Sequence, residues 1–255
     1  MASRDDNSVN EDAAASDGLA HSLDLLKDTY NYNHWIYSLL RPYIGSSVLE
    51  IGSGCGNISR FLLDRPHLTC LEPLADNIEA LERLAFLHRN LEVVKGWAED
   101  IPNDTVRSNH HDSVVCINVL EHIKDDQEAL VNLFSVLRPG GMLLLYVPAI
   151  RWAYGEMDRE LNHHRRYSCR RLKALLKNAG FRIVHHRYVN FIGLLGWWWS
   201  GRVLKEGIID PKKARFVDRI APHLMAWEGL VHPLMGQSLF FAAGLSWGWD
   251  VSSSW

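Results

Sequence analysis

The chain has 255 residues, which is enough to bury one core of good size together with a small subdomain. Its 47% hydrophobic and 22% charged residues are typical of a globular domain, and its formal net charge of −3 argues against a nucleic-acid partner. Four cysteines without a C-x-x-C pair argue against a disulfide framework or a zinc knuckle, and they favour a reducing, cytoplasmic setting.

The first part of the chain is polar. Residues 1–18 are rich in Asp, Asn and Ser and lack the basic-then-apolar order of a secretory leader, so they predict a disordered tail. Residues 19–46 form the next region, in which Trp35, Ile36 and Leu39 recur at helical spacing. The longest apolar run, 191–200, is too short to cross a bilayer, so we expect no transmembrane segment.

From residue 47 onward, short apolar segments alternate with amphipathic ones. The expected strands are Ser47–Ile51, Leu68–Leu71, Leu91–Val94, Ser113–Val119, Met142–Val147, Arg182–Val189 and Ser238–Leu245. The expected helices are 57–63, 74–87, 126–137 and 169–179, the last one ended by Gly180. Nearly apolar strands separated by helices predict a parallel sheet covered on both faces. Residues 47–255 therefore predict one doubly wound α/β domain, with a Trp-rich helical insert at 191–236.

A glycine loop joins the first strand to the next helix. It is spelled Glu50-x-Gly52-x-Gly54-x-Gly56, whereas the dinucleotide fingerprint is G-x-G-x-x-G and would need a glycine at Asn57. Glycine lets the backbone approach a ligand closely and adopt positive φ. Glu72, at the end of the second strand, can bind ribose hydroxyls in either cofactor class. A simple tight turn is the alternative for this loop.

Five segments, in order, resemble the motifs of class I S-adenosylmethionine (SAM)-dependent methyltransferases of the small-molecule type. These are VLEIGSGCGNIS, Leu71-Glu72-Pro73, Gly96–Pro102, CINVLEH at Cys116–His122, and Leu137–Gly141, which resembles the turn before strand five. The resemblance covers about residues 30–190 and the closing strand. It implies a Rossmann-like sheet of seven strands with the last strand antiparallel, helices of the N-terminal region acting as a lid, and SAM as cofactor, released as S-adenosylhomocysteine.

The resemblance also implies a set of cofactor-binding residues. The glycine loop passes beside the cofactor, Glu50 orients its amino-acid end, and Glu72 holds the ribose. The full set is Glu50, Gly52, Gly54, Gly56, Asn57, Glu72, Pro73, Asn77, Ala98, Glu99, Asn118 and Val119. Trp97 and Asn118 depart from the residues often found at these two positions in the family.

The acceptor is expected at two places in the chain. One is the block Asp158–Tyr167, which resembles a D-x-x-x-x-H-x-R-R-Y motif of a bacterial-type subgroup. Histidine can take a proton near neutral pH, and arginine can grip an anion. The candidate catalytic residues are His163, His164, Arg165 and His122, and the candidate substrate-binding residues are Tyr30, Tyr32, Tyr154, Asp158, Arg166 and Tyr167.

Structural alternatives exist for several of these residues. Asp158 can simply pair with Arg165 or Arg166 and brace the loop, and Tyr167 can cap a core edge. Glu121 and His122, just after the fourth strand, can form acid–base machinery or the floor of the pocket. The second acceptor region is the lid, where Tyr30 and Tyr32 are better candidates than Trp35, whose helical stripe favours the core.

The insert carries three successive tryptophans, Trp197-Trp198-Trp199, which cannot all lie on one side of a helix. Covered by a partner or ligand, they would form an acceptor pocket, a homodimer face or a contact with a membrane surface. A pocket wall or a dimer face is the favoured interpretation.

We therefore expect methyl transfer from SAM to a small-molecule acceptor, with O-methylation of a carboxylate or hydroxyl as first choice. Transfer to N or C of a lipid-like or glycosylated acceptor is the alternative. A non-catalytic SAM-binding protein and an NAD-dependent oxidoreductase are rivals of other classes. No metal is expected, because no Asp, Glu or His group shows ligand spacing in the sequence.

Overall fold

The computed structural model describes residues 29–101, 106, 111–200 and 211–245. The predicted tail at 1–18 lies outside the described residues, as do residues 19–28 of the predicted lid region and 201–210 of the insert.

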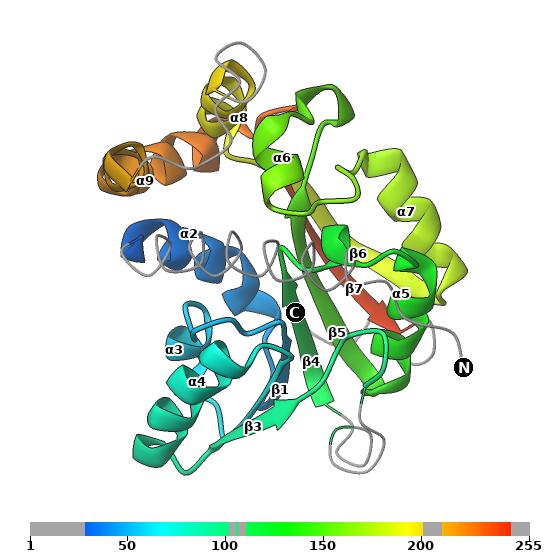
Figure 1. The fold of residues 1–255 in the computed structure, drawn as a ribbon. Coiled ribbons are helices and arrows are strands. Elements are labelled where there is room, and N and C mark those ends of the chain that lie inside the picture. The colour runs from blue at the N-terminus through cyan, green and yellow to red at the C-terminus, as the bar shows by residue number, and fades with distance from the viewer. Residues whose placement is uncertain (1–28, 102–105, 107–110, 201–210, 246–255) are drawn as a thin grey trace, which may run out of the picture.

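The described residues form a seven-stranded sheet in the order β3-β2-β1-β4-β5-β7-β6 (Figure 1). Its strands are β1 (Ser47–Ile51), β2 (His67–Glu72), β3 (Leu91–Lys95), β4 (His111–Ile117), β5 (Leu137–Pro148), β6 (Phe181–Val189) and β7 (Ser238–Leu245). β7 runs antiparallel to both of its neighbours, whereas the pairs from β3 to β5 are parallel. The predicted seven-stranded sheet with an antiparallel last strand is confirmed.

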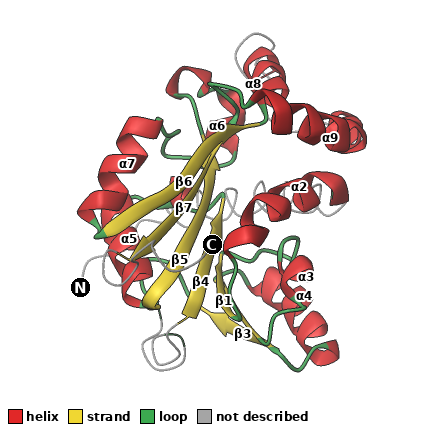
Figure 2. Cartoon of the chain, turned by 180° about the vertical axis from the view of Figure 1, so that it is seen from behind, coloured by secondary structure: helices red, strands yellow, loops and turns green. Residues whose placement is uncertain are grey.

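Helices cover both faces of the sheet (Figures 1 and 2). One face packs against α2 (Tyr30–Leu40), α3 (Ser59–Leu62), α4 (Ala75–Leu87) and α9 (Pro211–Val231), and the other packs against α5 (Asp126–Ser135) and α7 (Cys169–Asn178). The shorter elements are η1 (Arg41–Tyr43), η3 (Leu120–His122), η4 (Arg151–Ala153), α6 (Glu156–Glu160) and α8 (Phe191–Trp198).

The two cores follow from the alternation of side chains along each strand. Leu144 belongs to the core under α2, α3 and α4, and Leu145 belongs to the core under α5 and α7. Val48 and Leu49 divide in the same way, and all four are fully buried. A strand that is apolar at every position is stable only when both faces are covered, as the sequence pattern predicted.

The predicted boundaries around β4 and β5 differ from the structure. The Pro139–Gly141 segment does not precede the fifth strand but lies inside β5 as an irregularity, because the pairing passes from His111↔Leu137 to Ser113↔Met142. Gly140 has a φ of 81°, which favours glycine. β4 ends at Ile117, so Asn118, with a φ of 52°, leaves the strand direction.

Two acidic side chains of α9 hold neighbouring helices in place: one binds the N-terminal helix α2, and the other binds the start of α8. α2 packs along α9, and Asp218 of α9 accepts hydrogen bonds from the Tyr32 backbone N–H at 2.9 Å and from Asn31 Nδ2 at 3.1 Å. Glu228, buried in α9, accepts from the backbone N–H groups of Asn190 and Phe191 at the start of α8. The insert and the N-terminal helix thus form one packed layer.

The strand order reverses between β1 and β4, because β1 continues to β2 on one side while β4 continues to β5 on the other. In open α/β sheets, ligands bind in the crevice outside the carboxyl ends of the strands at such a point. The loops that leave β1 and β4 are therefore where a functional site is expected.

Across the described ranges 29–101, 106, 111–200 and 211–245, we find no helix with the length and apolarity needed to span a bilayer.

Gly180 offers a test of the backbone geometry. It ends α7 with a φ of 94°, and an added Cβ would lie 3.0 Å from the Phe134 ring. We expect Gly180→Ala to lower the free energy of unfolding by about 1–2 kcal/mol in chemical denaturation, the usual cost of the left-handed conformation. Gly196 of α8 is the matched control, because its added Cβ would meet no atom within 4 Å. Gly196→Ala should leave the free energy of unfolding unchanged or raise it by up to about 1 kcal/mol. Equal losses of stability in both variants would contradict the left-handed conformation assigned to Gly180.

Candidate active site

The glycine loop crosses the carboxyl end of β1. Gly52, Gly54 and Gly56 have φ values of 64°, 55° and 85°, so each has a conformation that side-chain-bearing residues rarely adopt. The Gly52 backbone N–H donates to the Leu71 carbonyl at 2.8 Å, which joins the loop to β2. A Cβ on Gly52 would lie 2.5 Å from Val119 Cγ2, so the loops after β1 and β4 touch here.

Glu72 is fixed against this loop by backbone and side-chain donors. Its side chain is buried, and Oε2 accepts from the Gly54 backbone N–H at 2.8 Å. Oε1 accepts from the Leu74 backbone N–H and from Asn77 Nδ2, both at 3.1 Å. Three donors set the direction of the carboxylate, and two of the predicted cofactor residues, Glu72 and Asn77, are hydrogen-bonded to each other.

Glu50 lies on β1 behind the loop. Its carboxylate accepts from Ser59 Oγ at 2.5 Å and contacts Cys70 Sγ at 3.6 Å. Burial raises the pKa of Glu50 from 4.5 to about 7, although the hydrogen bonds from Ser59 and Cys70 oppose that rise. Ser59 and Cys70 were not singled out from the sequence as site residues, and no local pattern marks them, because they are contributed by a helix and a neighbouring strand.

The remaining predicted cofactor residues lie around the same crevice. Ala98 is buried, and Glu99 is exposed with its backbone carbonyl accepting from Asn132 Nδ2 at 2.8 Å. Asn57 Oδ1 accepts from Arg60, and Pro73 directly follows Glu72. Asn118 is exposed at the end of β4, and its backbone N–H donates to Tyr146 O at 2.7 Å.

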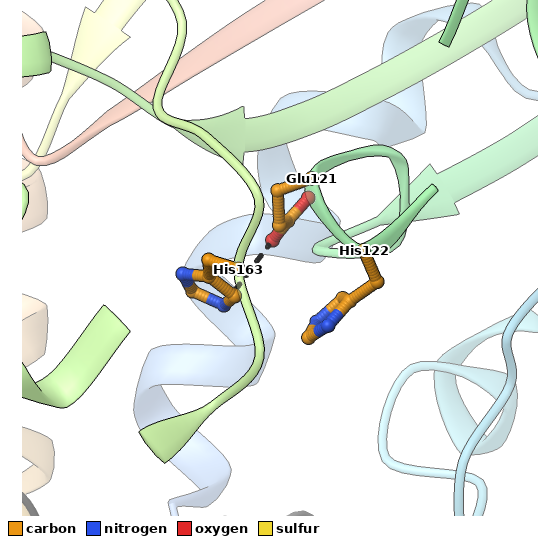
Figure 3. Close-up of side chains that lie close together, drawn as sticks. All are labelled: Glu121, His122 and His163. Carbon is orange, nitrogen blue, oxygen red and sulfur yellow. Dashed lines mark ion pairs between the residues drawn. The ribbon is translucent and has the colours of Figure 1, made fainter. Parts of the chain in front are cut away.

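A second group of side chains follows β4. Glu121 and His122 of η3 meet His163 from the loop after α6, and their donor atoms all lie within 4.8 Å of one another. Figure 3 shows the Glu121 carboxylate turned toward the His163 ring, with the His122 ring beside them. His163 Nε2 lies 3.9 Å from Glu121 Oε1, and the rings of His122 and His163 are 4.8 Å apart. The sequence does not bring these residues together, because His163 is far from Glu121 along the chain.

Burial dominates the protonation of this group. It raises the pKa of Glu121 to about 7, although nearby His163 and Arg166 oppose that rise. It lowers the pKa of His122 to about 3, and the neighbouring His163 and His164 lower the pKa further. Among the described residues, both carboxylate oxygens of Glu121 are buried without a hydrogen-bond partner. These residues could hold a metal ion, since each offers a lone pair to the same small volume.

Asp158 organises the surroundings of His163. Its Oδ1 accepts from Arg166 Nε at 2.7 Å and lies 2.9 Å from His163 Nδ1. Its Oδ2 accepts from the Gly155 backbone N–H and from Trp197 Nε1, at 3.0 and 3.2 Å. Burial raises the pKa of Asp158, but the hydrogen bonds from His163 and Arg166 and the charge of Arg166 outweigh it, so the pKa is lowered. The guanidinium of Arg166 also stacks over the Trp197 ring at 4.8 Å. Trp197 was predicted only as part of a Trp cluster.

Arg165 and Tyr167 point to the other side of this segment. Arg165 pairs with Asp126 at 2.9 Å and donates to the Lys124 carbonyl at 2.8 Å. Tyr167 is fully buried and its hydroxyl donates to the Leu120 carbonyl and Asp126, both at 3.1 Å. Both contacts brace the loop onto α5. The sequence had offered Asp158 as the bracing partner of Arg165 or Arg166, whereas in the structure Asp158 pairs with Arg166 and Arg165 pairs with Asp126. Asp126 was missed because its role depends on this long-range pairing.

The other candidate acceptor residues lie at the edges of the group. The Tyr154 hydroxyl donates to the His163 carbonyl at 2.8 Å, whereas the His164 side chain is exposed. Tyr32 is half-buried, with its hydroxyl 3.1 Å from that of the buried Tyr146. Tyr30 is 56% exposed and packs its ring on Phe61 of α3. Of the two tyrosines expected in a lid, Tyr30 therefore lies at the surface, and Tyr32 lies between α2 and the sheet.

Comparison with known proteins places this arrangement in a family. A family model described as a methyltransferase domain matches residues 25–186. A ubiquinone biosynthesis O-methyltransferase of Rickettsia bellii is 28% identical over 102 residues, which cover 38% of this chain and 40% of the relative. The chain therefore spans less than half the length of that curated relative.

Two solved structures share the fold. The 1,6-didemethyltoxoflavin-N1-methyltransferase of Burkholderia thailandensis, solved with S-adenosylhomocysteine, has a TM-score of 0.59 at 15% identity and covers 96% of this chain and 92% of its own. The [4+2]-cyclase SpnF has a TM-score of 0.57 at 17% identity and covers 84% of this chain and 80% of its own. Since a cyclase shares the fold, architecture alone does not decide the reaction.

The buried Glu50 gives a pH-dependent prediction for the cofactor-free protein. Its pKa is about 7 in the folded state and near 4.5 when exposed, so the neutral form favours folding. The free energy of unfolding should therefore fall as pH rises from about 4.5 to about 7. Glu50→Gln removes this loss. At pH 8 the Glu50→Gln variant should be more stable than the unsubstituted chain by roughly 3 kcal/mol, because each unit of the pKa difference between the exposed and the buried carboxyl is worth about 1.4 kcal/mol. Denaturation of both proteins at pH 4 and pH 8 tests this, and an equal difference at the two pH values would contradict it.

Proposed function

The chain belongs to the family of methyltransferase domains, and we propose that it is an enzyme that transfers the methyl group of SAM to an oxygen atom of a small acceptor. When bound, SAM supplies a methyl group on a positively charged sulfur, which is already activated for transfer. The protein then has to bind the cofactor, align the acceptor and exclude water.

The residues beside β1 and β2 fit this cofactor. A Cβ at Gly52 would clash with Val119, so only glycine lets the loop after β1 pack this closely against the loop after β4. The Glu72 carboxylate is held beside Gly54 by its hydrogen bond of 2.8 Å, at the position where an acid binds the two ribose hydroxyls. This contact is the observation that carries the proposal. Glu50, at the start of the loop, would orient the amino-acid end of the cofactor.

Oxygen is favoured as the acceptor atom by the chemistry of the group at Glu121, His122 and His163. A hydroxyl acceptor must lose its proton when the carbon–oxygen bond forms and the carbon–sulfur bond breaks, with the electron pair of that bond staying on sulfur. The group offers three lone-pair donors next to the loop that touches Gly52. A carboxylate acceptor would need no base. The name of the Rickettsia relative agrees with oxygen, whereas the toxoflavin enzyme is named for transfer to nitrogen.

The Trp-rich insert favours a second candidate, a lipid-like acceptor methylated at N or C. α8 exposes a stripe of apolar side chains, and Trp152 of η4 packs edge-on against it with its ring 6.4 Å from that of Trp198. The exposed residues of the stripe are Ile192, Leu195, Trp198 and Trp199. Such a surface could also join two copies of the chain. Methyl transfer to a lipid-linked sugar, with none to phenols or carboxylates, would favour this candidate.

The cofactor assignment is tested by Glu72→Ala. We expect SAM affinity, measured by calorimetric titration, to fall roughly tenfold to a hundredfold, because one or two charge-assisted hydrogen bonds worth about 1.5–3 kcal/mol each are lost. Glu82→Ala removes an exposed carboxylate from α4, the helix that follows β2, and should leave the affinity unchanged. Undiminished SAM binding by Glu72→Ala would refute the assignment, as would tight NAD binding without any response to SAM.

The acceptor assignment is tested by His163→Gln. With a hydroxyl acceptor found in a panel of phenols, carboxylates and lipid-linked sugars, kcat for S-adenosylhomocysteine release should fall about 10²- to 10⁴-fold. SAM affinity should stay the same. His223→Gln changes an exposed histidine on α9 and serves as control. SAM binding without turnover on any acceptor would instead support a non-catalytic binding protein.

A further inference from the structure

We propose that Glu121, His122 and His163 bind a divalent transition-metal ion, with Zn²⁺ the best match, beside the cofactor loop. This inference deepens the proposed function and rests on it for the role of the ion, but ion binding itself can be measured without any acceptor. It also reverses the expectation from the sequence that no metal is used.

The buried carboxylate of Glu121 carries the inference. The side chain has no exposed surface, and within the described part of the chain neither carboxylate oxygen has a hydrogen-bond partner. Buried polar groups are nearly always hydrogen-bonded, because leaving one without a partner is costly. A cation between Glu121 and the two histidines would satisfy both oxygens, and Figure 3 shows the carboxylate turned toward that space.

The three donor atoms are close enough to share one ion. All lie within 4.8 Å of one another, and His163 Nε2 is 3.9 Å from Glu121 Oε1. Ligand bonds of about 2.0–2.2 Å around a tetrahedral Zn²⁺ need donor atoms somewhat closer together than the 3.9 Å between His163 Nε2 and Glu121 Oε1. Small side-chain rotations would close the gap, since η3 already holds Glu121 and His122 on the same short turn.

The surroundings prepare His163 for this role. Its Nδ1 lies 2.9 Å from Asp158, an acceptor-only carboxylate when ionised, so Nδ1 donates and Nε2 keeps its lone pair. Metal-binding histidines usually have such a carboxylate behind them, and it fixes both the ring and the tautomer. Arg166, at 2.7 Å, and Trp197 in turn hold Asp158. The usual geometry of a histidine ligand with its supporting carboxylate is thus present around a histidine that faces Glu121.

The donor set selects the class of ion. Two imidazoles and one carboxylate suit Zn²⁺ and related first-row ions, whereas Mg²⁺ prefers oxygen ligands alone. Three protein ligands leave a fourth tetrahedral position open, as in catalytic rather than structural zinc sites. In the proposed enzyme this position would take the acceptor oxygen, and the ion would lower the pKa of its hydroxyl so that the proton passes to solvent before methyl transfer.

The test is metal titration of the full chain after treatment with a chelator, using Zn²⁺ by calorimetry and Co²⁺ by visible absorption. We expect one equivalent of ion with tetrahedral Co²⁺ bands. His163→Gln and Glu121→Gln should weaken the affinity at least a hundredfold, and Asp158→Asn about tenfold to a hundredfold through loss of its support. His223→Gln should bind as the unsubstituted chain does. Thermal unfolding without metal checks that each variant folds.

The partly exposed thiols of Cys55 and Cys169 are a second source of zinc binding, so the titrations are repeated with both changed to Ser. Binding that disappears with these thiols, or that is unaffected by His163→Gln and Glu121→Gln in folded protein, overturns the metal site.

The two proposals fail separately. Full methyl transfer by chelator-treated protein with no bound ion overturns the catalytic role of the ion and leaves the proposed function standing. Binding of the ion as expected, without methyl transfer to any acceptor, overturns the proposed function and leaves the metal site standing.

Discussion

The hydrogen bond from the Gly54 backbone N–H to the Glu72 carboxylate is the contact on which the cofactor site depends. It is possible because β1 and β2 are parallel neighbours, so the loop after one strand and the acid at the end of the other meet at the same edge. Positive φ at Gly52, Gly54 and Gly56 lets the loop turn tightly across that edge. The strand order, the positions of the three glycines and the buried Glu72 carboxylate therefore together bring the loop and the acid to the same edge of the sheet.

A second buried acid, Asp158, plays the corresponding part on the acceptor side. It binds Arg166 and His163 with one oxygen and Gly155 and Trp197 with the other, so a loop, a helix and the insert are fixed around one carboxylate. This leaves the far nitrogen of His163 facing Glu121. The two sides meet where Val119 packs against Gly52.

Much of the fold could be predicted from the sequence, because periodicity and glycine positions are local properties. The seven strands, Gly180 as helix end and the place of Glu72 at the end of β2 follow from them. The pairings of the acceptor side could not be predicted. Adjacent residues Arg165 and Arg166 point to opposite partners, Asp126 and Asp158, and only the tertiary fold decides which arginine takes which acid. The approach of His163 to Glu121 likewise depends on how the loop after α6 returns over η3.

The most direct test of the whole account is a crystal structure of the chain grown with S-adenosylhomocysteine. We expect the ligand to lie along residues 52–56, with its ribose hydroxyls on the Glu72 carboxylate and its sulfur on the side of Val119 and Glu121. A ligand bound elsewhere, or a loop that stays unoccupied at saturating concentration of ligand, would contradict it.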